Sequence, residues 1–351
     1  MEPILTLPPI KLDHIRTLTN DTGIMEHSTF SIPNRREGYT TDDNARALVA
    51  VLKCYKVQRV PDVTDLLRIY LSFLLQMQKP DGAFTNLLDS SLHRHGDALN
   101  DAQGQALWAC GYAVQSNIEA GVRHLAKELF DKGLRWSFVS SSPRLKAYAI
   151  RGLHYYQKAF PSDLNVPSNL IALAEQLTTL YHTHGSRDWC WFEPYLTYAN
   201  ATLPHALFLA YESTGKKEFL TVAKATLEFL IKVQVIQGMF IPIGNKGWYQ
   251  KGGKRAFYDQ QPIEAAHMIE AASSALHLTG KKNYQQIAYL VFNWFFGKNV
   301  KGVILYDQAT GGCFDGITPE GSNLNQGAES TIAYLLARTE IEKVQPVRDS
   351  I

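Results

Sequence analysis

A short repeat limits how this chain can fold more than any other sequence feature. The tetrapeptide Thr214–Lys217 (TGKK) follows an alanine-rich apolar segment and precedes EFLTVAKATLEFLIKV. Thr279–Lys282 (TGKK) stands in the same way before NYQQIAYLVFNWFFGK. A glycine directly after an apolar-periodic segment supplies the left-handed cap that ends a helix. The repeat therefore predicts pairs of helices joined by tight turns, and a period of tens of residues is typical of an array of such pairs.

The same template fits the whole chain. It gives six first helices, beginning near residues 41, 100, 143, 199, 262 and 327, with second helices between them and a sixth second helix around LDHIRTL. The first helices are rich in Ala and Gly and apolar on more than one face, whereas the second helices carry a charged stripe, as expected of an inner and an outer layer. We therefore expect an all-α fold: one (α/α)6 toroid domain over residues 1–345, followed by a tail at 346–351.

Charge and cysteine content exclude several function classes. The 35 Lys and Arg against 33 Asp and Glu give a net charge of +2, too balanced for the electrostatic footprint of a nucleic-acid binder. The four cysteines form no CxxC pair, which argues against a structural zinc site and a thioredoxin-type centre. No basic stretch leads into an apolar signal core, and no apolar run could span a bilayer. We expect a cytoplasmic protein with no nucleic-acid or membrane partner, no cofactor and no metal, although Asp42, Asp43 and Asp101 would suit calcium if their oxygens converged.

Long irregular segments rich in Gly and aromatic residues lead from the second helices into the first ones. They are QKPDGAFTN, SRDWCWFEPYLTY, QGMFIPIGNKGWYQKGGKRAFYDQQ and KGVILYDQATGGCFDGITPEGSNLNQ. Loops of this length are usually functional, and in a toroid they all enter the inner helices from one end of the ring. The sequence therefore predicts the functional site at that end.

Acidic residues gather at the starts of the inner helices. The catalytic candidates are Asp42, Asp43, Asp101 and Glu329, and Glu193, Asp259 and Glu264 are candidates for substrate binding. Each acid taken alone could be a helix cap that complements the helix dipole. Together they would line one cleft, and glycoside hydrolysis needs one carboxylic acid and an opposed carboxylate. We expect Asp42 or Asp43 as the base and Glu329 or Asp101 as the acid, a choice that depends on their separation across the cleft.

Aromatic and basic residues in the same loops are candidates for binding sugar. Trp189, Trp191, Trp248 and Tyr258 would form a platform on which sugar rings stack, unless they fill the hydrophobic interior instead. His27, Arg36 and Tyr39 lie in the loop before the first inner helix and could hydrogen-bond hydroxyl groups. The alternative for the arginine is an ion pair with a surface acid.

Two resemblances point to carbohydrate chemistry. The helical layout and the segment QMQKPDGAF resemble the (α/α)6 toroid superfamily of carbohydrate-active enzymes. The segments GYTTDDNARAL and LYDQATGGCFDGITPEGSNLNQGAESTIAYLLA are similar to stretches of bacterial glycoside-hydrolase-like toroids found beside, or fused to, glycosyltransferases and mannoside-processing enzymes. A weaker likeness to the inverting family 9 cellulases implies a base near the first inner helix, at Asp42 or Asp43, and an acid at Glu329 on the last, although the DxxxD-type spacing of that family is absent.

These observations favour a glycoside hydrolase that acts on a mannose- or glucose-containing oligosaccharide. A sugar 2-epimerase remains an alternative, because His205 and His267 fall on the fourth and fifth inner helices and such an enzyme would need paired histidines in the cleft. A second alternative is a non-catalytic sugar-binding domain that serves a partner glycosyltransferase. This alternative requires the aromatic residues but not the acids.

Overall fold

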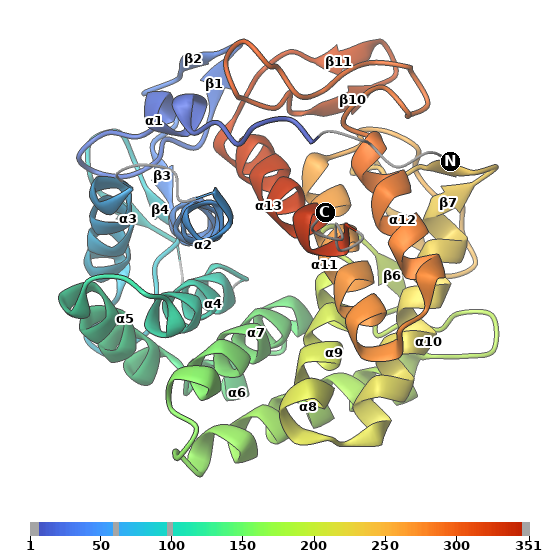
Figure 1. Cartoon of the computed structure of the whole chain (residues 1–351), viewed down its shortest axis with the longest axis horizontal. Coiled ribbons are helices and arrows are strands. Elements are labelled where there is room, and N and C mark those ends of the chain that lie inside the picture. The colour runs from blue at the N-terminus through green and yellow to red at the C-terminus, as the bar shows by residue number, and fades with distance from the viewer. Residues whose placement is uncertain (1–6, 59–62, 97–100, 346–351) are drawn as a thin grey trace, which may run out of the picture.

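The computed structural model describes residues 7–58, 63–96 and 101–345, so the predicted tail at 346–351 lies outside the described residues. Six long helices form an inner ring in this part of the chain (Figure 1). They are α2 (Thr41–Gln58), α4 (Asp101–Gln115), α7 (Pro143–Ala159), α9 (Thr202–Thr214), α11 (Pro262–Thr279) and α13 (Ala328–Val344). Each packs against the next, and α13 closes the ring against α2.

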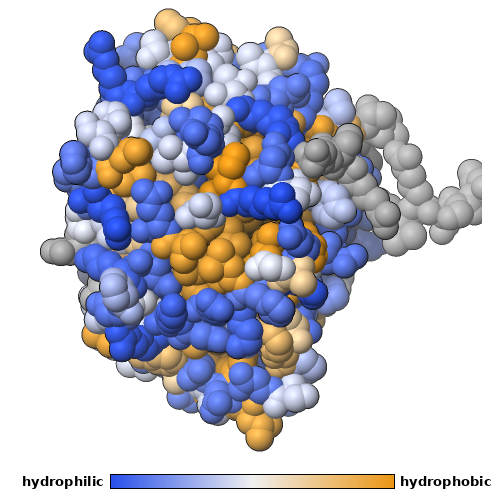
Figure 2. All heavy atoms as spheres, turned by 90° about the vertical axis from the view of Figure 1, so that its left-hand side faces the viewer, coloured by the Kyte–Doolittle hydropathy of each residue, from blue (hydrophilic) through white to orange (hydrophobic). Residues whose placement is uncertain are grey.

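A second layer of helices surrounds this ring. It contains α1 (Asp13–Leu18), α3 (Thr64–Met77), α5 (Ala120–Gly133), α8 (Asn165–His184), α10 (Lys217–Gln234) and α12 (Lys282–Asn293), with the single turn α6 (Trp136–Val139) after α5. The predicted glycine caps are confirmed, since Gly215 and Gly280 end α9 and α11 with φ angles of 70° and 66°. Figure 2 shows one flank of this layer, where hydrophilic side chains surround a central hydrophobic area.

All the described strands lie in the connections that lead from an outer helix to the next inner helix. They are β1 (Ser28–Thr29), β2 (Ile32–Pro33), β3 (Tyr39–Thr40), β4 (Leu87–Leu88), β5 (Arg94–His95), β6 (Tyr195–Leu196), β7 (Val235–Ile236), β8 (Met239–Phe240), β9 (Tyr249–Gln250), β10 (Gly316–Thr318) and β11 (Gly321–Asn323). They pair antiparallel as β1–β2, β3–β4–β5, β6–β9, β7–β8 and β10–β11. The loops that the sequence marks as irregular are thus held together by short ladders at one end of the ring.

The inner helices α4 and α7 approach each other closely because glycines face each other across the contact. A Cβ added to Gly111 would lie 2.2 Å from the Gly152 carbonyl oxygen, and one added to Gly152 would lie 2.6 Å from the Leu107 carbonyl oxygen. Neither backbone can move away without separating the two helices. The small residues at this contact therefore set the helix spacing on this side of the ring.

Gly111→Ala is expected to lower the free energy of unfolding by about 1–3 kcal/mol, the usual range for overpacking a tight core. Urea unfolding of the variant measures this loss. Gly121→Ala in α5 is the matched control, because the nearest atom to its added Cβ lies 3.8 Å away. That control should be neutral or more stable by roughly 0.5–1 kcal/mol. Equal effects of the two changes would contradict the close-contact explanation.

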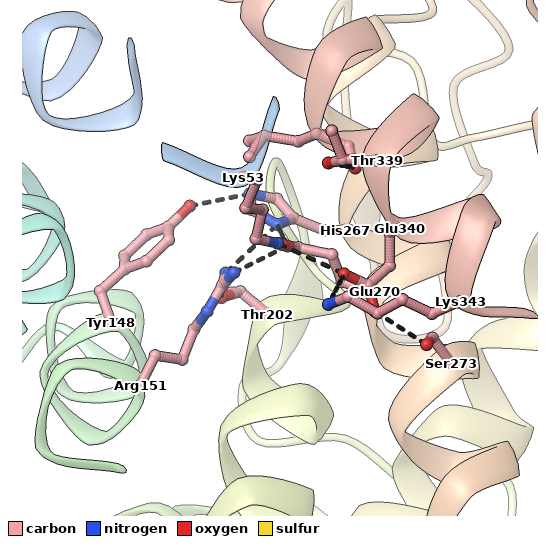
Figure 3. Close-up of polar contacts among 11 residues, drawn as sticks. Lys53, Tyr148, Arg151, Thr202, His267, Glu270, Ser273, Thr339, Glu340 and Lys343 are labelled. Carbon is pink, nitrogen blue, oxygen red and sulfur yellow. Dashed lines mark hydrogen bonds and ion pairs between the residues drawn. The ribbon is translucent and has the colours of Figure 1, made fainter. Parts of the chain in front are cut away.

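Charged side chains fill the axis of the ring (Figure 3). Glu270 of α11 lies at the centre, where its Oε1 accepts from Lys53 Nζ of α2 at 2.6 Å and its Oε2 accepts from Arg151 Nη2 of α7 at 2.8 Å. Glu340 of α13 lies 3.4 Å from the same lysine nitrogen. These four side chains are at most 8% exposed. Burial raises the pKa of Glu270, but the charges of Arg151 and Lys53 outweigh it and hold that pKa well below its ordinary value.

Candidate functional site

A cavity of about 170 Å³ opens at the end of the ring where the inner helices begin. Its walls come from five inner helices and two of the connecting loops: Asp42, Arg46, Asn86, Asp101, Ala102, Gln105, Tyr148, Tyr198, Ala199, Ile263 and Glu329. Glu329 and Asp42 are the second residues of α13 and α2, and Asp101 is the first residue of α4. Because α13, α2 and α4 are consecutive in the ring, three neighbouring helices present carboxylates from their first turns to one cavity.

Arg46 links the acids on one side of this cavity. Its Nη2 donates to Asp43 Oδ1 at 2.7 Å and lies 3.4 Å from Asp42 Oδ2, and its Nη1 donates to Glu329 Oε2 at 2.7 Å. The guanidinium is only 4% exposed, whereas the Glu329 side chain is 38% exposed. One buried cation thus holds three carboxylates in fixed positions, and two of them, Asp42 and Glu329, reach the cavity.

Asp43 lies behind this group and not on the cavity wall. It is 3% exposed, and its Oδ2 accepts a hydrogen bond from the Thr40 hydroxyl. Burial raises the pKa of Asp43 well above its ordinary value, Arg46 opposes this, and Asp42 and Glu329 add to the rise. One guanidinium cannot compensate three carboxylates, so the group retains a proton most readily on Asp43. Asp43 therefore supports its neighbours and does not itself face the cavity.

Asp101 approaches the cavity from another side. Its Oδ1 accepts from the Ser142 hydroxyl at 2.6 Å and its Oδ2 from the Tyr198 hydroxyl at 2.5 Å. The Tyr198 ring is 41% exposed, and its centroid lies 6.1 Å from that of Trp248. Both carboxylate oxygens of Asp101 are therefore oriented by hydroxyl donors, next to an accessible aromatic surface.

A wider cleft of about 470 Å³ continues from the cavity, with Asp101 and Tyr198 on the shared wall. On its floor Arg144 Nη1 donates to Glu193 Oε2 at 2.9 Å, and Arg144 Nη2 donates to the Thr197 hydroxyl at 2.7 Å. A narrow polar cavity that opens into a broader cleft has room for one ring of a ligand inside and for further units outside.

Two polar atoms of the cavity residues are buried without a hydrogen-bond partner: Asp42 Oδ1 and Gln105 Oε1. A buried acceptor left unpaired costs about 1–3 kcal/mol, so such atoms require an explanation. Hydroxyl groups of a bound ligand would supply the missing donors. This pair of acceptors is the clearest sign that the cavity is built to receive a ligand rich in hydroxyl groups.

The structure does not bring the whole predicted aromatic platform together. Trp191 is fully buried, and Trp189 is 4% exposed with its ring against Phe229 of α10. Neither indole has a face free for a sugar ring. These two tryptophans therefore fill the hydrophobic interior, which was the alternative to a sugar-stacking role. Trp248 is half-buried beside Tyr198 at the cleft, and the half-buried Tyr258 has Lys301 over its ring at 5.4 Å.

The predicted binding residues of the first loop lie outside the cavity wall. His27 and Arg36 are exposed, and His27 Nε2 lies 3.5 Å from Glu26 Oε1. Tyr39 is 8% exposed, and its hydroxyl accepts from Asn20 Nδ2 at 2.8 Å. Asp259, in a later loop, pairs with Lys246 at 3.3 Å. These four residues do not touch the cavity that the acids surround.

Glu264 is a buried carboxyl one residue beyond Ile263 of the cavity wall. It is 2% exposed, Asn200 Nδ2 donates to its Oε2 at 3.0 Å, and its Oε1 has no partner. Burial raises the pKa of Glu264 to about 7, although the Asn200 hydrogen bond lowers it. In the unfolded chain the carboxyl has its ordinary pKa of 4.5. The folded protein therefore keeps a proton that the unfolded chain loses as the pH rises between these values.

This difference predicts how stability depends on pH. The contribution of Glu264 is complete below about pH 4.5 and is lost as the pH rises to about 7, by roughly 3 kcal/mol in total. Glu264→Gln should remove this loss, so the free energy of unfolding of the wild type should fall relative to the variant between pH 4.5 and 8. Urea unfolding across that range tests the expectation, and parallel profiles would contradict it.

The two histidines of the epimerase alternative lie on the neighbouring inner helices α9 and α11 but do not line the same cavity. His267 is 1% exposed; its Nε2 is 2.9 Å from the Tyr148 hydroxyl and its Nδ1 is 3.1 Å from Glu270 Oε2 (Figure 3). Tyr148 lines the carboxylate cavity, so His267 reaches it only through this hydroxyl. His205 lines a separate cavity at the opposite end. The paired-histidine arrangement that the sequence left open is therefore not formed in one cleft.

The described residues contain no group of three His, Cys, Asp or Glu side chains that could hold a metal ion. Asp42, Asp43 and Asp101 do not converge as a calcium site would require, because Arg46 pairs with the first two and hydroxyl groups surround the third. Of the helices in the described ranges, none is both long and apolar enough to cross a bilayer.

Several residues of the site were missed from the sequence. Arg46 could have been found, since it stands three and four residues after Asp43 and Asp42 on one helix face. Tyr148, Gln105 and Tyr198 carry no local signal, because nothing near them in the sequence shows that they face the ring axis or the cleft. Only the closed ring brings them to the acids.

The two concentric layers of helices define the class of fold, an (α/α)6 toroid. Neither a protein-family model nor a curated protein matches the sequence. Among solved structures, the cellobiose 2-epimerase from Bacillus thermoamylovorans B4167 is similar with a TM-score of 0.71 over 95% of each chain, at 10% sequence identity. A GH76 α-mannanase from Bacteroides thetaiotaomicron gives a TM-score of 0.66 over 93% of this chain and 92% of its own, at 13% identity.

A GH family 9 endoglucanase, J30, gives a TM-score of 0.56 over 91% of this chain and 74% of its own, at 12% identity. At such low identity these likenesses show the fold alone. They confirm the expected (α/α)6 toroid and its resemblance to toroids of carbohydrate enzymes. The finer resemblance, to proteins found beside glycosyltransferases, stays a prediction.

Proposed function

We propose that this chain is a glycoside hydrolase that holds one sugar ring of an oligosaccharide in the carboxylate cavity. The observation that carries the proposal is the set of first-turn carboxylates, Asp42, Asp101 and Glu329, which line one cavity from three neighbouring inner helices. Cleaving a glycosidic bond requires a proton donor at the leaving oxygen and a carboxylate that activates water or attacks the sugar carbon. The unpaired oxygens of Asp42 and Gln105 would accept hydrogen bonds from the sugar hydroxyls.

The contacts of the acids suggest how the roles divide. Asp101 accepts hydrogen bonds from the hydroxyl groups of Ser142 and Tyr198, so both of its oxygens are held in place, which suits a base or nucleophile. Glu329 is the most exposed member of the Arg46 group, at 38%, and lines the cavity, where it would be accessible to a leaving group. We assign Glu329 as the acid, and Asp42 or Asp101 as the base.

A sugar 2-epimerase is the second candidate, and the similarity to solved structures supports it better than the hydrolase, because cellobiose 2-epimerase matches with a TM-score of 0.71 and the GH76 α-mannanase with 0.66. In this chain such chemistry would use Tyr148, whose hydroxyl reaches the cavity and is backed by His267 and Glu270. The chain Glu270–His267–Tyr148 could move a proton at the cavity floor without a second histidine. We also propose a glycosyltransferase as a partner, and the support for this is the resemblance of two segments, GYTTDDNARAL and LYDQATGGCFDGITPEGSNLNQGAESTIAYLLA.

Incubation in D₂O separates these functions. The panel contains α- and β-linked manno- and gluco-oligosaccharides together with free mannose, glucose and cellobiose, and NMR follows the products. A hydrolase releases new reducing ends, and the first anomer formed shows whether configuration is retained or inverted. A 2-epimerase converts the free sugars into their C2 epimers and leaves the linkages intact. Sugar binding without any turnover would overturn both enzyme proposals and favour the sugar-binding domain.

A further inference from the structure

A second cavity, of about 530 Å³, opens at the opposite end of the ring, where the inner helices end. All six inner helices contribute to its walls, with Tyr112, Ser273 and Glu340 among the deeper residues and Lys56, Lys158 and Lys343 at the exposed rim. It plays no part in the proposed hydrolysis, because it shares no lining residue with the carboxylate cavity.

The lining of this cavity is basic. Its charged residues are the four lysines Lys53, Lys56, Lys158 and Lys343 and the two glutamates Glu212 and Glu340, a net charge of +2 with the three histidines counted as neutral. Lys53, Lys158 and Lys343 pair with glutamates. Lys56 has no ion pair or hydrogen bond within the described part of the chain. Lys56 therefore gives the cavity one positive charge that no acid of the described residues compensates.

Helix dipoles explain only part of this charge. Lys56, Lys158 and Lys343 lie in the last turns of α2, α7 and α13, where cations complement the partial negative charge of a helix end. That account does not cover Lys53, which lies more than one turn before the end of α2.

His205 provides the second, independent sign of a ligand. It is only 4% exposed, and its Nδ1 is buried without a hydrogen-bond partner. Burial lowers the pKa of His205 well below its ordinary value, so the ring is neutral and one nitrogen remains an unpaired donor or acceptor. A buried polar atom in this condition costs about 1–3 kcal/mol unless something entering the cavity pairs with it.

A smaller cavity of about 320 Å³ adjoins the first and shares Lys56 and Gln115 with it. Its walls include the apolar side chains of Leu52 and Ile118 and the ring of Tyr55. A ligand that spans both would place an anionic group among the lysines and an organic part against the apolar wall. A phosphomonoester fits this division, since it carries about −1.5 to −2 charges at pH 7 and strong acceptor oxygens.

We propose that this basic cavity binds a phosphomonoester of a small organic alcohol, at the end of the ring opposite the carboxylate cavity. Lys56, Lys158 and Lys343 contact the phosphate, His205 pairs with the ligand at the floor, and the adjoining apolar cavity takes part of the organic group. The proposal does not rest on hydrolase or epimerase activity.

Titration calorimetry of the wild type with inorganic phosphate, mannose 6-phosphate, phenyl phosphate and unphosphorylated mannose tests this proposal. The two esters should bind saturably and more tightly than inorganic phosphate. Any binding of mannose should be the same in the wild type and in the lysine variant described next. In Lys56→Gln/Lys158→Gln the affinity for the better ester should fall about tenfold or more, the factor that corresponds to one lost charge-assisted hydrogen bond. The control is Lys232→Gln, which removes one lysine charge from the last turn of the outer helix α10 and should bind as the wild type does.

His205→Leu tests the floor of the cavity. It should weaken ester binding and raise the melting temperature of the free protein, because it removes an unpaired buried polar atom. Absence of saturable binding to the wild type would overturn the proposal, and so would equal losses in Lys232→Gln and the double variant. Asp101→Asn should bind the esters normally, so failure of the hydrolase proposal and failure of this one are distinguishable.

Discussion

Glu270→Gln is expected to lower the free energy of unfolding by about 3–5 kcal/mol, the usual cost of removing one partner from a buried ion pair. Glu270 compensates both Lys53 and Arg151, and all three side chains are at most 3% exposed. The neutral amide would leave two buried cations with only Glu340 nearby. Urea unfolding at neutral pH measures the change.

Two further variants show whether charge or packing causes this loss. Glu340→Gln should cost less, because its second partner Lys343 is 50% exposed and can turn toward water. Replacing Lys53, Arg151 and Glu270 together by methionine should give a protein closer to the wild type in stability than Glu270→Gln alone, since no uncompensated charge then remains. A loss below about 1 kcal/mol in Glu270→Gln would show that water or a rearranged side chain compensates the cations.

Neutralising the cavity acids is expected to have the largest effect on turnover. Glu329→Gln and Asp101→Asn should each lower kcat by roughly 10²–10⁴-fold, the range that one acid or base contributes. Asp42→Asn should lower it comparably if Asp42 is the base. Rates on the best substrate of the panel, measured beside melting curves, separate lost chemistry from lost folding.

Matched acids in the outer layer provide the controls. Asp65 stands in the first turn of α3 and Glu218 in the first turn of α10, so each complements a helix dipole without lining the cavity. Asp65→Asn and Glu218→Gln should keep wild-type turnover. If Glu329→Gln behaves like Glu218→Gln, the cavity acids are helix caps, and the hydrolase proposal fails.

The ring and its layers could be predicted because they repeat. Two helix pairs carry the same local pattern of apolar residues, a glycine and a basic turn, and the alternation of apolar helices with charge-striped helices extends the array to the other pairs. The positions of the first-turn acids Asp42, Asp101, Glu264 and Glu329 followed directly from the predicted helix starts, and the structure confirms those positions.

The inside of the site could not be predicted in the same way. Trp189 and Trp248 lie in loops of similar composition, yet one packs against α10 and the other beside Tyr198 at the cleft. Loop composition does not specify the direction of a side chain. The charged residues on the ring axis come from four helices, and no local sequence pattern marks any one of them. Their pairing depends on the width of the ring. Glycine contacts such as Gly111 against Gly152 help to set that width.

The ring has a seam between α13 and α2. Between every other pair of neighbouring inner helices the sequence contains one outer helix and its connecting loops. Between α2 and α13 it contains nearly the whole chain. Their meeting therefore requires closure of by far the longest loop, which makes it slow compared with forming the hairpins. The ion pairs Arg46–Glu329 and Lys53–Glu340 both cross this seam. A partly folded chain with all its hairpins but an open seam would keep its helical content and lack the carboxylate cavity, so ligand binding there would report ring closure itself.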